Sequence, residues 1–500
     1  MNKLQKLSAT LFAILLTFSA CTKSLELEPI SEISNSSFWK TENDATAALN
    51  GMYARLRIPA ASNFYMWGEA RSEIMGPSLA GTAGLEIYYQ NILDKRNISS
   101  TQVVSNNTWL SLYAIVHDAN LILKNVPGIQ FTSEAAKKSI LAQAYTMRAF
   151  IYFQMTKIWG DVVLVTEPSN DLSPETIHKE RSPKSEVMAF IKKDINDAVS
   201  LFENNKFSTG RNRWSKPAAL ALKADVYLWS GKRMNAGNAD IQTALEALNE
   251  IENSDVALLD NFSSVFEYNN KGNKEIVMSV NFKDGESGGT SFGFMYMHSL
   301  FMPTNIDQET KNAIGAFGGA PYWAPTALVR NQFTQDDQRK KASFLEIYTY
   351  DNQNNKTYFG SLGYKFKGVE IGGQRQFLDD VVLYRYADIL LMKAEAKNVL
   401  GQDPSIEINK VRKRAYQNNF SAHIFANGNK VQNDEAILKE RLLELIFEGK
   451  RWWDLIRFDK AFDIVPSLIS RKGQDYLLLF PIAESTLSLE PKVKQNPGFN

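Results

Sequence analysis

Three glutamates near the C-terminus have the spacing that could carry acid–base chemistry. Glu440, Glu444 and Glu448 lie four residues apart in "LKERLLELIFEGKRWWDLIRFDK", which begins at Leu438. On one helix they share a face and repel each other by about 0.2–0.5 kcal/mol per pair. A hydrolase could use two of them as acid and base, or they could belong to a structural ion-pair network. We favour the network, because the many Arg and Trp residues beside them leave little access for a substrate. The basic candidates to pair with them are Arg385, Arg441, Lys450, Arg451 and Arg457.

Other catalytic and metal-site patterns are weak in this sequence. The 500 residues include one Cys and four His, and no two His share a metal-ligand spacing, so a Cys/His zinc site is not expected. The phosphate-loop, dinucleotide and nucleophile-elbow motifs do not occur. The pairs Asp336-Asp337 and Asp379-Asp380 could touch a cation, so calcium is possible, but we predict neither a metal nor a cofactor. The formal net charge of +1 gives no general attraction for nucleic acid.

Aromatic residues offer a different chemistry, the stacking of sugar rings. Sugars bind through their apolar faces to aromatic rings and through their hydroxyls to planar polar side chains. Most rings of any protein belong to its core, but two stretches combine rings with glycine and polar residues: residues 64–91 and a Gly-rich segment after residue 283. In the second, Tyr296, Tyr322 and Trp323 are the best platforms. Pro321 and Pro325 bracket the last two and should hold them rigidly.

The elements that must position these residues are mostly helices. Apolar spacing predicts a helix after Thr41 and another over 113–126, which Pro127 and Gly128 end. Three later helices, beginning near Gln143, Ala219 and Ala387, resemble one another. Each carries a basic residue followed by Ala, and we expect each to end at a glycine: Gly160, Gly231 and Gly401. A second amphipathic helix follows each, over 184–203, 240–252 and 404–416, which indicates helical hairpins of the tetratricopeptide kind.

Between residues 255 and 380 the pattern changes. "EIVMSVNF", from Glu275, is typical of a short strand, and "TYFGSLGYKFKG", from Thr357, alternates in the manner of a β-hairpin. The rest is Gly-rich and aromatic. Long irregular segments of this kind are uncommon in helical proteins unless they have a function.

The N-terminus has the pattern of a secretory signal. Lys3 and Lys6 precede ten apolar residues, 9–18, which are too few to span a bilayer. The only cysteine, Cys21, follows two small residues and resembles the lipid-attachment site of bacterial lipoproteins. We therefore predict a signal peptide over 1–20, acylation of Cys21 and a polar tether over 21–35; an ordinary signal with a chance cysteine is the alternative.

Five segments together resemble the SusD/RagB family of nutrient-binding outer-membrane lipoproteins. They are "EISNSSFWKTENDATAALNGMYARL", "RAFIYFQMTKIWGDVVLV", "RYADILLMKAEAKNVLG", "ERLLELIFEGKRWWDLIRF" and "LFPIAESTLSLEPKVKQNPGF". The resemblance implies a mainly α SusD-like fold, in which tetratricopeptide-like hairpins support an irregular, loop-rich region with a few short strands. It implies an N-terminal helical region over 36–255 and a C-terminal region over 256–500 that form one compact body.

The resemblance also implies a function. A family member is a lid that captures oligosaccharide at the cell surface and delivers it to a SusC-like TonB-dependent transporter, and it is not an enzyme. Its lipid anchor holds it on the outer membrane, on the exterior face. The segment "GEARSE" looks like the family's acidic and Arg-containing motif, and in family members with glycan sites the residues in and just after this motif contact the ligand. That carries over to Arg71, Glu73, Tyr88, Tyr89 and Asn91.

Three alternatives remain open at this point. The ligand of a RagB-like member is a peptide. A secreted helical glycosidase would need two carboxylates facing one cleft. A helical-repeat scaffold that binds only protein would keep its aromatic loops buried.

Overall fold

The computed structural model describes residues 38–99, 108–169, 173, 177–286 and 288–499. The predicted signal peptide, Cys21 and the tether over 21–35 lie outside these residues. The helices are α3 Glu42–Ala61, α4 Asn63–Glu69, α5 Glu86–Tyr89, α6 Thr108–Asn125, α7 Glu134–Trp159, α9 Lys184–Leu201, α10 Lys216–Arg233, α11 Asn238–Ile251, α12 Gln308–Ile314, α13 Ala327–Arg330, α14 Gln338–Ser343, α15 Tyr386–Val399, α16 Ser405–Tyr416, α17 Lys430–Leu445, α18 Arg451–Arg457, α19 Ala461–Ile464 and α20 Glu484–Leu489.

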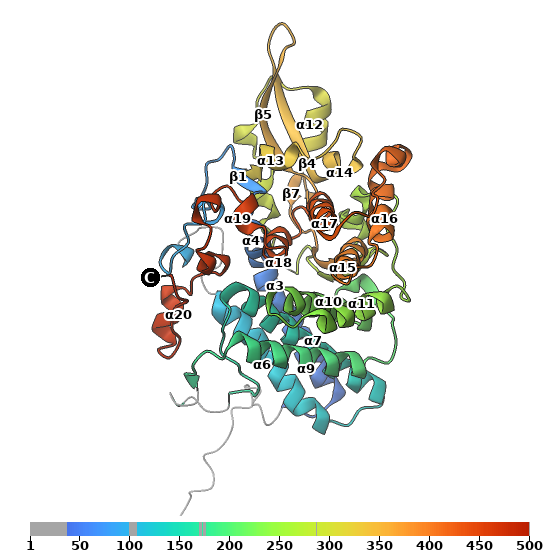
Figure 1. Cartoon of the computed structure of the whole chain (residues 1–500). Coiled ribbons are helices and arrows are strands. Elements are labelled where there is room, and N and C mark those ends of the chain that lie inside the picture. Colours follow the sequence, from blue (N-terminus) through green and yellow to red (C-terminus); the bar gives the residue numbers. More distant parts are fainter. Residues whose placement is uncertain (1–37, 100–107, 170–172, 174–176, 287, 500) are drawn as a thin grey trace, which may run out of the picture.

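The long helices stack as antiparallel hairpins on one side of the molecule (Figure 1). Helix α3 packs on α6, α7 on α9, α10 on α11 and α15 on α16. Successive pairs also touch, through α6 and α7, α9 and α10, and α11 and α15. The mainly helical architecture and the hairpins that we predicted from the repeated helices are confirmed.

Local sequence explains where several helices begin and end. Thr41 accepts from the amide of Asp44 and the Asp44 carboxylate accepts from that of Thr41, a reciprocal cap that starts α3. Gly160 ends α7 with a φ of 73°, which glycine adopts without strain. The prediction for Gly231 was wrong, because α10 continues to Arg233. A Cβ on Gly231 would lie 2.5 Å from Ile241 Cδ1, so this glycine allows α11 to approach closely.

The described residues form four two-stranded antiparallel sheets, of which three make the irregular side in the upper part of Figure 1. The fourth, built from residues 276–280 and 381–385, packs on α10 and α15. The strands of the four sheets are β1 Met75–Pro77, β2 Ile276–Val280, β3 Trp323–Pro325, β4 Phe344–Tyr350, β5 Lys356–Gly363, β6 Val369–Ile371, β7 Gln374–Gln376 and β8 Val381–Arg385. The pairs are β1–β3, β2–β8, β4–β5 and β6–β7. The strand predicted in "EIVMSVNF" is β2. The hairpin predicted at 357–368 exists in part: its first segment is β5, but the partner strand is the upstream β4.

The predicted C-terminal helix is two helices. Helix α17 ends at Leu445 and α18 begins at Arg451, and between them Phe447 and Gly449 both have a φ of 69°. Helix α4 lies against this turn so closely that a Cβ on Gly68 would be 1.8 Å from the Gly449 carbonyl oxygen. The Glu69 carboxylate accepts from the backbone amides of Phe447, at 2.5 Å, and Arg451, at 3.0 Å.

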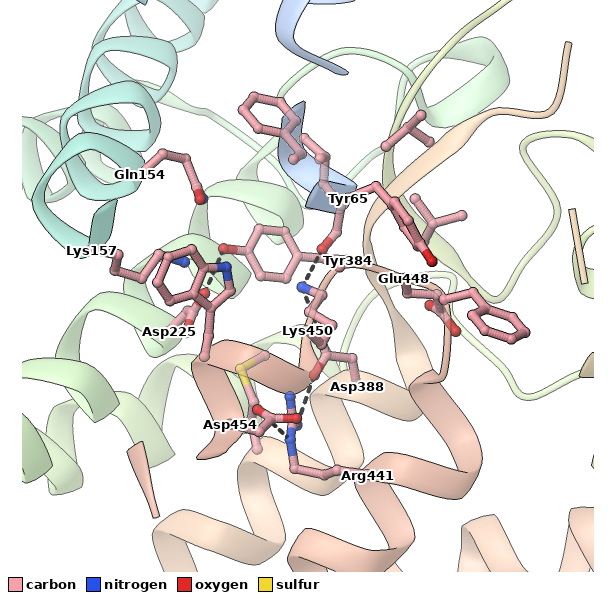
Figure 2. A pocket seen from close by; sticks show the side chains of 18 of the residues that line it. Tyr65, Gln154, Lys157, Asp225, Tyr384, Asp388, Arg441, Glu448, Lys450 and Asp454 are labelled. Carbon is pink, nitrogen blue, oxygen red and sulfur yellow. Dashed lines mark hydrogen bonds and ion pairs between the residues drawn. The ribbon is translucent and has the colours of Figure 1, made fainter. Parts of the chain in front are cut away.

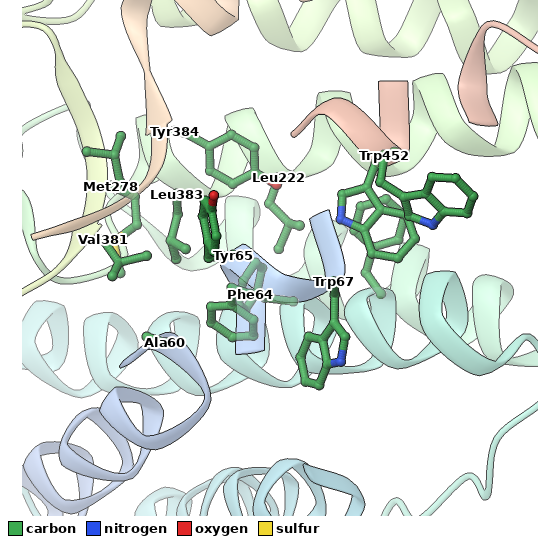
Figure 3. Close-up of a cluster of buried hydrophobic side chains, with 14 of the residues drawn as sticks. Ala60, Phe64, Tyr65, Trp67, Leu222, Met278, Val381, Leu383, Tyr384 and Trp452 are labelled. Atoms are coloured by element: carbon green, nitrogen blue, oxygen red, sulfur yellow. The ribbon is translucent and has the colours of Figure 1, made fainter. Parts of the chain in front are cut away.

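One large apolar cluster joins the two predicted regions, 36–255 and 256–500. Figure 3 shows its centre, where Phe64, Tyr65 and Trp67 of α4 meet Tyr384 of β8 and Trp452 of α18. Helix α4 is buried along its whole length. It lies between the two regions, with Phe64 against Phe150 and Glu69 bonded to the Phe447 amide. Within the described residues, no helix combines the length and apolarity that crossing a membrane requires.

Candidate functional site

The three C-terminal glutamates are buried and paired with arginine or lysine. Arg339 contacts Glu440 at 2.7 Å and Glu444 at 3.1 Å. Arg385 contacts Glu444 at 2.7 Å and Glu448 at 2.8 Å. Burial opposes ionisation of Glu444, but Arg414, Arg385 and Arg339 outweigh it and hold its pKa well below the usual range. Since Glu448 lies beyond the end of α17, only two of the three glutamates share the helix.

The other predicted basic partners bind different carboxylates. Arg441 and Lys450 both contact Asp388. Arg457 pairs with Glu395 at 2.8 Å, and Arg451 pairs with Glu73 at 2.5 Å. Burial works against the charge of Glu395, but Arg457 and Lys232 bring its pKa down to about 2. The ion-pair interpretation of this segment therefore holds. Of the five basic residues that we predicted as partners, Arg385 is the one that contacts Glu444 and Glu448.

A small polar cavity lies beside this network (Figure 2). Side chains of α7, α10, β8 and the α17–α18 turn line it, among them Lys157, Asp225, Tyr384 and Lys450. Burial lowers the pKa of the Lys157 amine to about 8. The cavity volume is ≈ 50 Å³, which holds water molecules but leaves no room for a sugar ring. It is part of the folded interior.

Four of the predicted ligand contacts in and after "GEARSE" are buried and contact other parts of the protein. Arg71 is 1% exposed and lies between the rings of Trp452 and Phe480. Its guanidinium donates to Asn91 Oδ1 at 2.7 Å and to the carbonyl oxygens of Leu477 and Leu479. The remaining members of this set are also buried: Glu73 on Arg451, Asn91 on Arg71 and Ser467, and Tyr88 in the apolar cluster. These side chains hold the fold together, and Asn91 also borders a surface groove of ≈ 480 Å³. Their role as ligand contacts stays a prediction.

Two of the three predicted platforms in the Gly-rich segment are buried as well. Tyr296 is fully covered and donates its hydroxyl to the Ile314 carbonyl at 2.8 Å, with Arg375 over its ring. Trp323 is 0% exposed and packs edge-on against Tyr65, with ring centroids 5.4 Å apart. All three residues of β3 are buried, and Trp323 belongs to the apolar cluster. A sugar cannot stack on either ring in this conformation.

The two aromatic stretches of the sequence, residues 64–91 and the Gly-rich segment after residue 283, nevertheless lie side by side near Tyr322. In the β1–β3 pair Pro77 lies opposite Trp323, and the Ala80 amide donates to the Pro321 carbonyl at 2.9 Å. Tyr322 is half-buried and its ring packs on Phe294, with centroids 5.7 Å apart. We call the loops 78–84, 291–302 and 316–322 around this ring the loop face. Tyr89 is half-buried too, at the end of α5.

A surface groove of ≈ 620 Å³ lies elsewhere and contains none of the eight predicted residues. Tyr268 and Tyr364 line it together with exposed amides such as Asn269. Rings followed by amides, as in "EYNN", are the signal that could have marked it. Lys271 lies over the Tyr268 ring and Lys367 over the Tyr364 ring, at 4.3 and 4.8 Å, so both rings already carry a protein partner.

The two aspartate pairs are engaged in protein contacts. Asp336 contacts His423 at 2.8 Å and Asp337 binds Arg339 at 2.8 Å. Asp380 contacts Lys271 at 2.9 Å, and burial raises the pKa of Asp379 to about 7. Among the described residues no group of three or more His, Cys, Asp or Glu side chains is arranged to hold a metal ion.

The chain is similar in sequence and in structure to known proteins of one family. Residues 273–499 match the model of the SusD family, and residues 25–228 match a model described as starch-binding and associating with the outer membrane. A solved structure of NanU from B. fragilis has 33% sequence identity and a TM-score of 0.81, covering 95% of this chain and 100% of that one. A SusD superfamily protein from Bacteroides vulgatus has 32% identity and a TM-score of 0.81, covering 92% and 100%. SusD-like protein P38 of Formosa agariphila is 29% identical over 526 residues, which cover 99% of each chain.

Proposed function

Because this chain belongs to the SusD family, we propose that it is a cell-surface glycan-binding protein that captures oligosaccharide and delivers it to a SusC-like TonB-dependent transporter of the outer membrane. The proposal makes it a binding protein and not an enzyme. The description of the matched N-terminal model, starch-binding and associating with the outer membrane, supports both the ligand class and the location.

The observation that carries the proposal is the loop face around Tyr322. Two segments far apart in the sequence converge there, and their rings remain partly exposed while most surrounding rings are buried. The Tyr322 amide donates to the Phe294 carbonyl at 3.0 Å, and Pro321 precedes it, so its backbone is fixed. A ring held in place loses little conformational entropy when a sugar stacks on it. Tyr89 stays a predicted contact at the margin of this face.

The membrane location depends on the N-terminus. We infer that Cys21 becomes the first mature residue and carries acyl chains, which hold the protein on the exterior face of the outer membrane through the tether over 21–35. Growth with a labelled fatty acid checks this: the wild-type protein should take up label, and Cys21→Ala should not. Purification of the chain with its membrane should also recover a large transporter barrel.

The alternative functions predict different results. A RagB-like protein would bind peptides and ignore glycans. A glycosidase would release reducing ends, but the three paired carboxylates at the C-terminus are covered by protein and offer no acid–base pair to a substrate. A protein-binding scaffold would bind neither class. The division into regions 36–255 and 256–500 stays a prediction.

Binding to polysaccharide tests the proposal directly. Native gels that contain soluble starch, laminarin, xylan or pectin should slow the wild-type chain in at least one case, with no sugar released. Tyr322→Ala should lose about 1–3 kcal/mol of binding free energy, measured by titration calorimetry. Tyr322→Phe keeps the ring and should bind like the wild type. Equal binding by Tyr322→Ala would remove the loop face from the proposal.

A further inference from the structure

The β4–β5 hairpin projects from the irregular side of the molecule, at the top of Figure 1. Its strands pair from Phe344 opposite Gly363 out to Tyr350 opposite Lys356. Every residue from 351 to 358 is exposed. The base of the hairpin is part of the core through Phe344, Ile347 and Leu362, but its outer half adds little to it. A two-stranded ribbon is only marginally stable without packing.

One aromatic ring on this hairpin is both exposed and fixed. Tyr358 is 42% exposed. The Arg330 guanidinium lies over its ring at 4.5 Å from the centroid, its hydroxyl donates to Ser361 Oγ at 3.2 Å, and the Tyr348 ring packs against it at 5.9 Å and 77°. Three contacts of different kinds thus restrain one surface side chain.

The support for this ring is itself anchored. Arg330 Nη1 donates to the Pro325 carbonyl at 2.6 Å, and Arg330 Nε contacts Glu346 at 3.1 Å. Pro325 belongs to β3, which is paired with β1 under the loop face. Because Arg330 covers part of Tyr358, a ligand would contact the part of the side chain that remains exposed. A ring held in this way loses little entropy on binding, and the cation below it adds to its rigidity.

The hairpin also carries polar side chains of the kind that bind sugar hydroxyls, and these lie at its tip. The hairpin tip reads "DNQNNKT", and the side-chain amides of Asn352, Gln353 and Asn354 are exposed and without hydrogen-bond partners in the described part of the chain. Protein interfaces are centred on larger apolar patches with few exposed amides. A rigid ring on the same hairpin as unpaired amides is closer to the chemistry of a carbohydrate site.

The hairpin base adjoins the loop face. A Cβ on Gly360 would lie 3.5 Å from the Leu79 side chain, and the neighbouring Ala80 bonds to Pro321, the residue before Tyr322. Ser361 Oγ lies 3.5 Å from the Pro325 carbonyl oxygen. A short chain of direct contacts therefore connects Tyr358 with Tyr322.

We propose that the β4–β5 hairpin is a second glycan-contacting element, in which Tyr358 stacks on a sugar unit outside the loop face. This inference rests on the proposed function and deepens it: the ligand is an oligosaccharide long enough to contact Tyr322 and Tyr358 together. Short oligosaccharides occupy the loop face alone, and affinity rises when the chain reaches the hairpin.

Ligand length separates the two contacts. The polysaccharide that slows the wild type in native gels is hydrolysed and size-fractionated, and each fraction is titrated calorimetrically. Tyr358→Ala should weaken binding of the long fractions by roughly tenfold, equivalent to about 1.4 kcal/mol, and leave the disaccharide unchanged. Tyr322→Ala should weaken all fractions. Tyr358→Phe, which keeps the ring, should resemble the wild type.

The possible failures are distinguishable. If Tyr322→Ala weakens binding and Tyr358→Ala binds every fraction like the wild type, the hairpin proposal is wrong and the proposed function stands. If no polysaccharide slows the wild type, the proposed function fails and the hairpin proposal fails with it. If Tyr358→Ala binds every fraction like the wild type but no longer co-purifies with the transporter barrel, the hairpin binds protein and the proposal is overturned. Thermal melting shows whether each variant is folded.

Discussion

Arg71 and Arg330 make the same kind of contact in two different settings. Arg71 lies between Trp452 and Phe480 with three further bonds to buried groups, and it is 1% exposed. Arg330 lies over Tyr358, a ring that faces solvent. The contacts of Arg71 belong to the protein interior, whereas Arg330 supports a ring that a ligand can reach. Both contacts place an arginine over an aromatic ring, so the exposure of the ring decides what the contact can do.

The largest expected effect is at the buried network. Arg385→Met removes a cation that contacts Glu275, Glu444 and Glu448 together and leaves Arg414 and Lys365 among their partners. Breaking a buried pair costs about 3–5 kcal/mol. Urea unfolding should show this loss. The matched control is Arg55→Met, which breaks an exposed pair with Asp118 and should cost about 1 kcal/mol or less. Equal losses would mean that the network does not stabilise the fold.

Trp323 and Tyr322 are adjacent and should behave differently. Trp323→Ala opens a cavity beside Tyr65, and such a change costs about 3–5 kcal/mol of stability. Tyr322→Ala should cost much less stability and act on glycan binding. Urea unfolding and calorimetry on both variants measure the difference. A stable Trp323→Ala protein that has lost only binding would place Trp323 at the ligand after all.

Replacement of each of the two arginines by methionine tests whether they differ in their contribution to stability. Arg71→Met leaves the Leu477 and Leu479 carbonyls and Asn91 without their donor, which should cost about 3 kcal/mol. Arg330→Met removes the pair with Glu346 and the donor to the Pro325 carbonyl and should cost about 1.5 kcal/mol. It should also weaken the binding of long oligosaccharides, because Tyr358 loses its support. Similar unfolding curves for the two variants would contradict the assignment of Arg71 to the interior.

Glu395 should make stability depend on acid pH. Its pKa falls to about 2 in the folded protein from an ordinary value near 4.5, so between these pH values the unfolded chain binds more protons. Its contribution is complete above about pH 4.5 and is lost as the pH falls towards 2. Glu395→Gln should cost about 1.5–3 kcal/mol at pH 7. Its unfolding free energy should approach that of the wild type in acid, and a constant gap would contradict this.

The helices were largely predictable from sequence, because apolar spacing and caps such as Thr41 are local signals. Helix α4 was not, since seven residues that are buried on all sides show no period. The break at Phe447 and Gly449 was missed because apolar residues continue across it. Composition located the loop face but could not assign its exposed ring. That choice depends on the β1–β3 pairing, which joins segments far apart in the chain and turns Trp323 inward and leaves Tyr322 outside.

The contact of Glu69 with the α17–α18 turn also determines when the molecule can fold. The carboxylate and the Phe447 amide are separated by 378 residues, and contacts of such high sequence separation form slowly. A nascent chain that has released only its first half offers α4 its contacts with α3 and α7, such as Phe64 on Phe150, but not those with α18. Part of the apolar surface of α4 then stays open to solvent or to chaperones. We therefore expect a fragment that stops near residue 255 to aggregate, and the whole chain to reach its native state only after synthesis is almost complete.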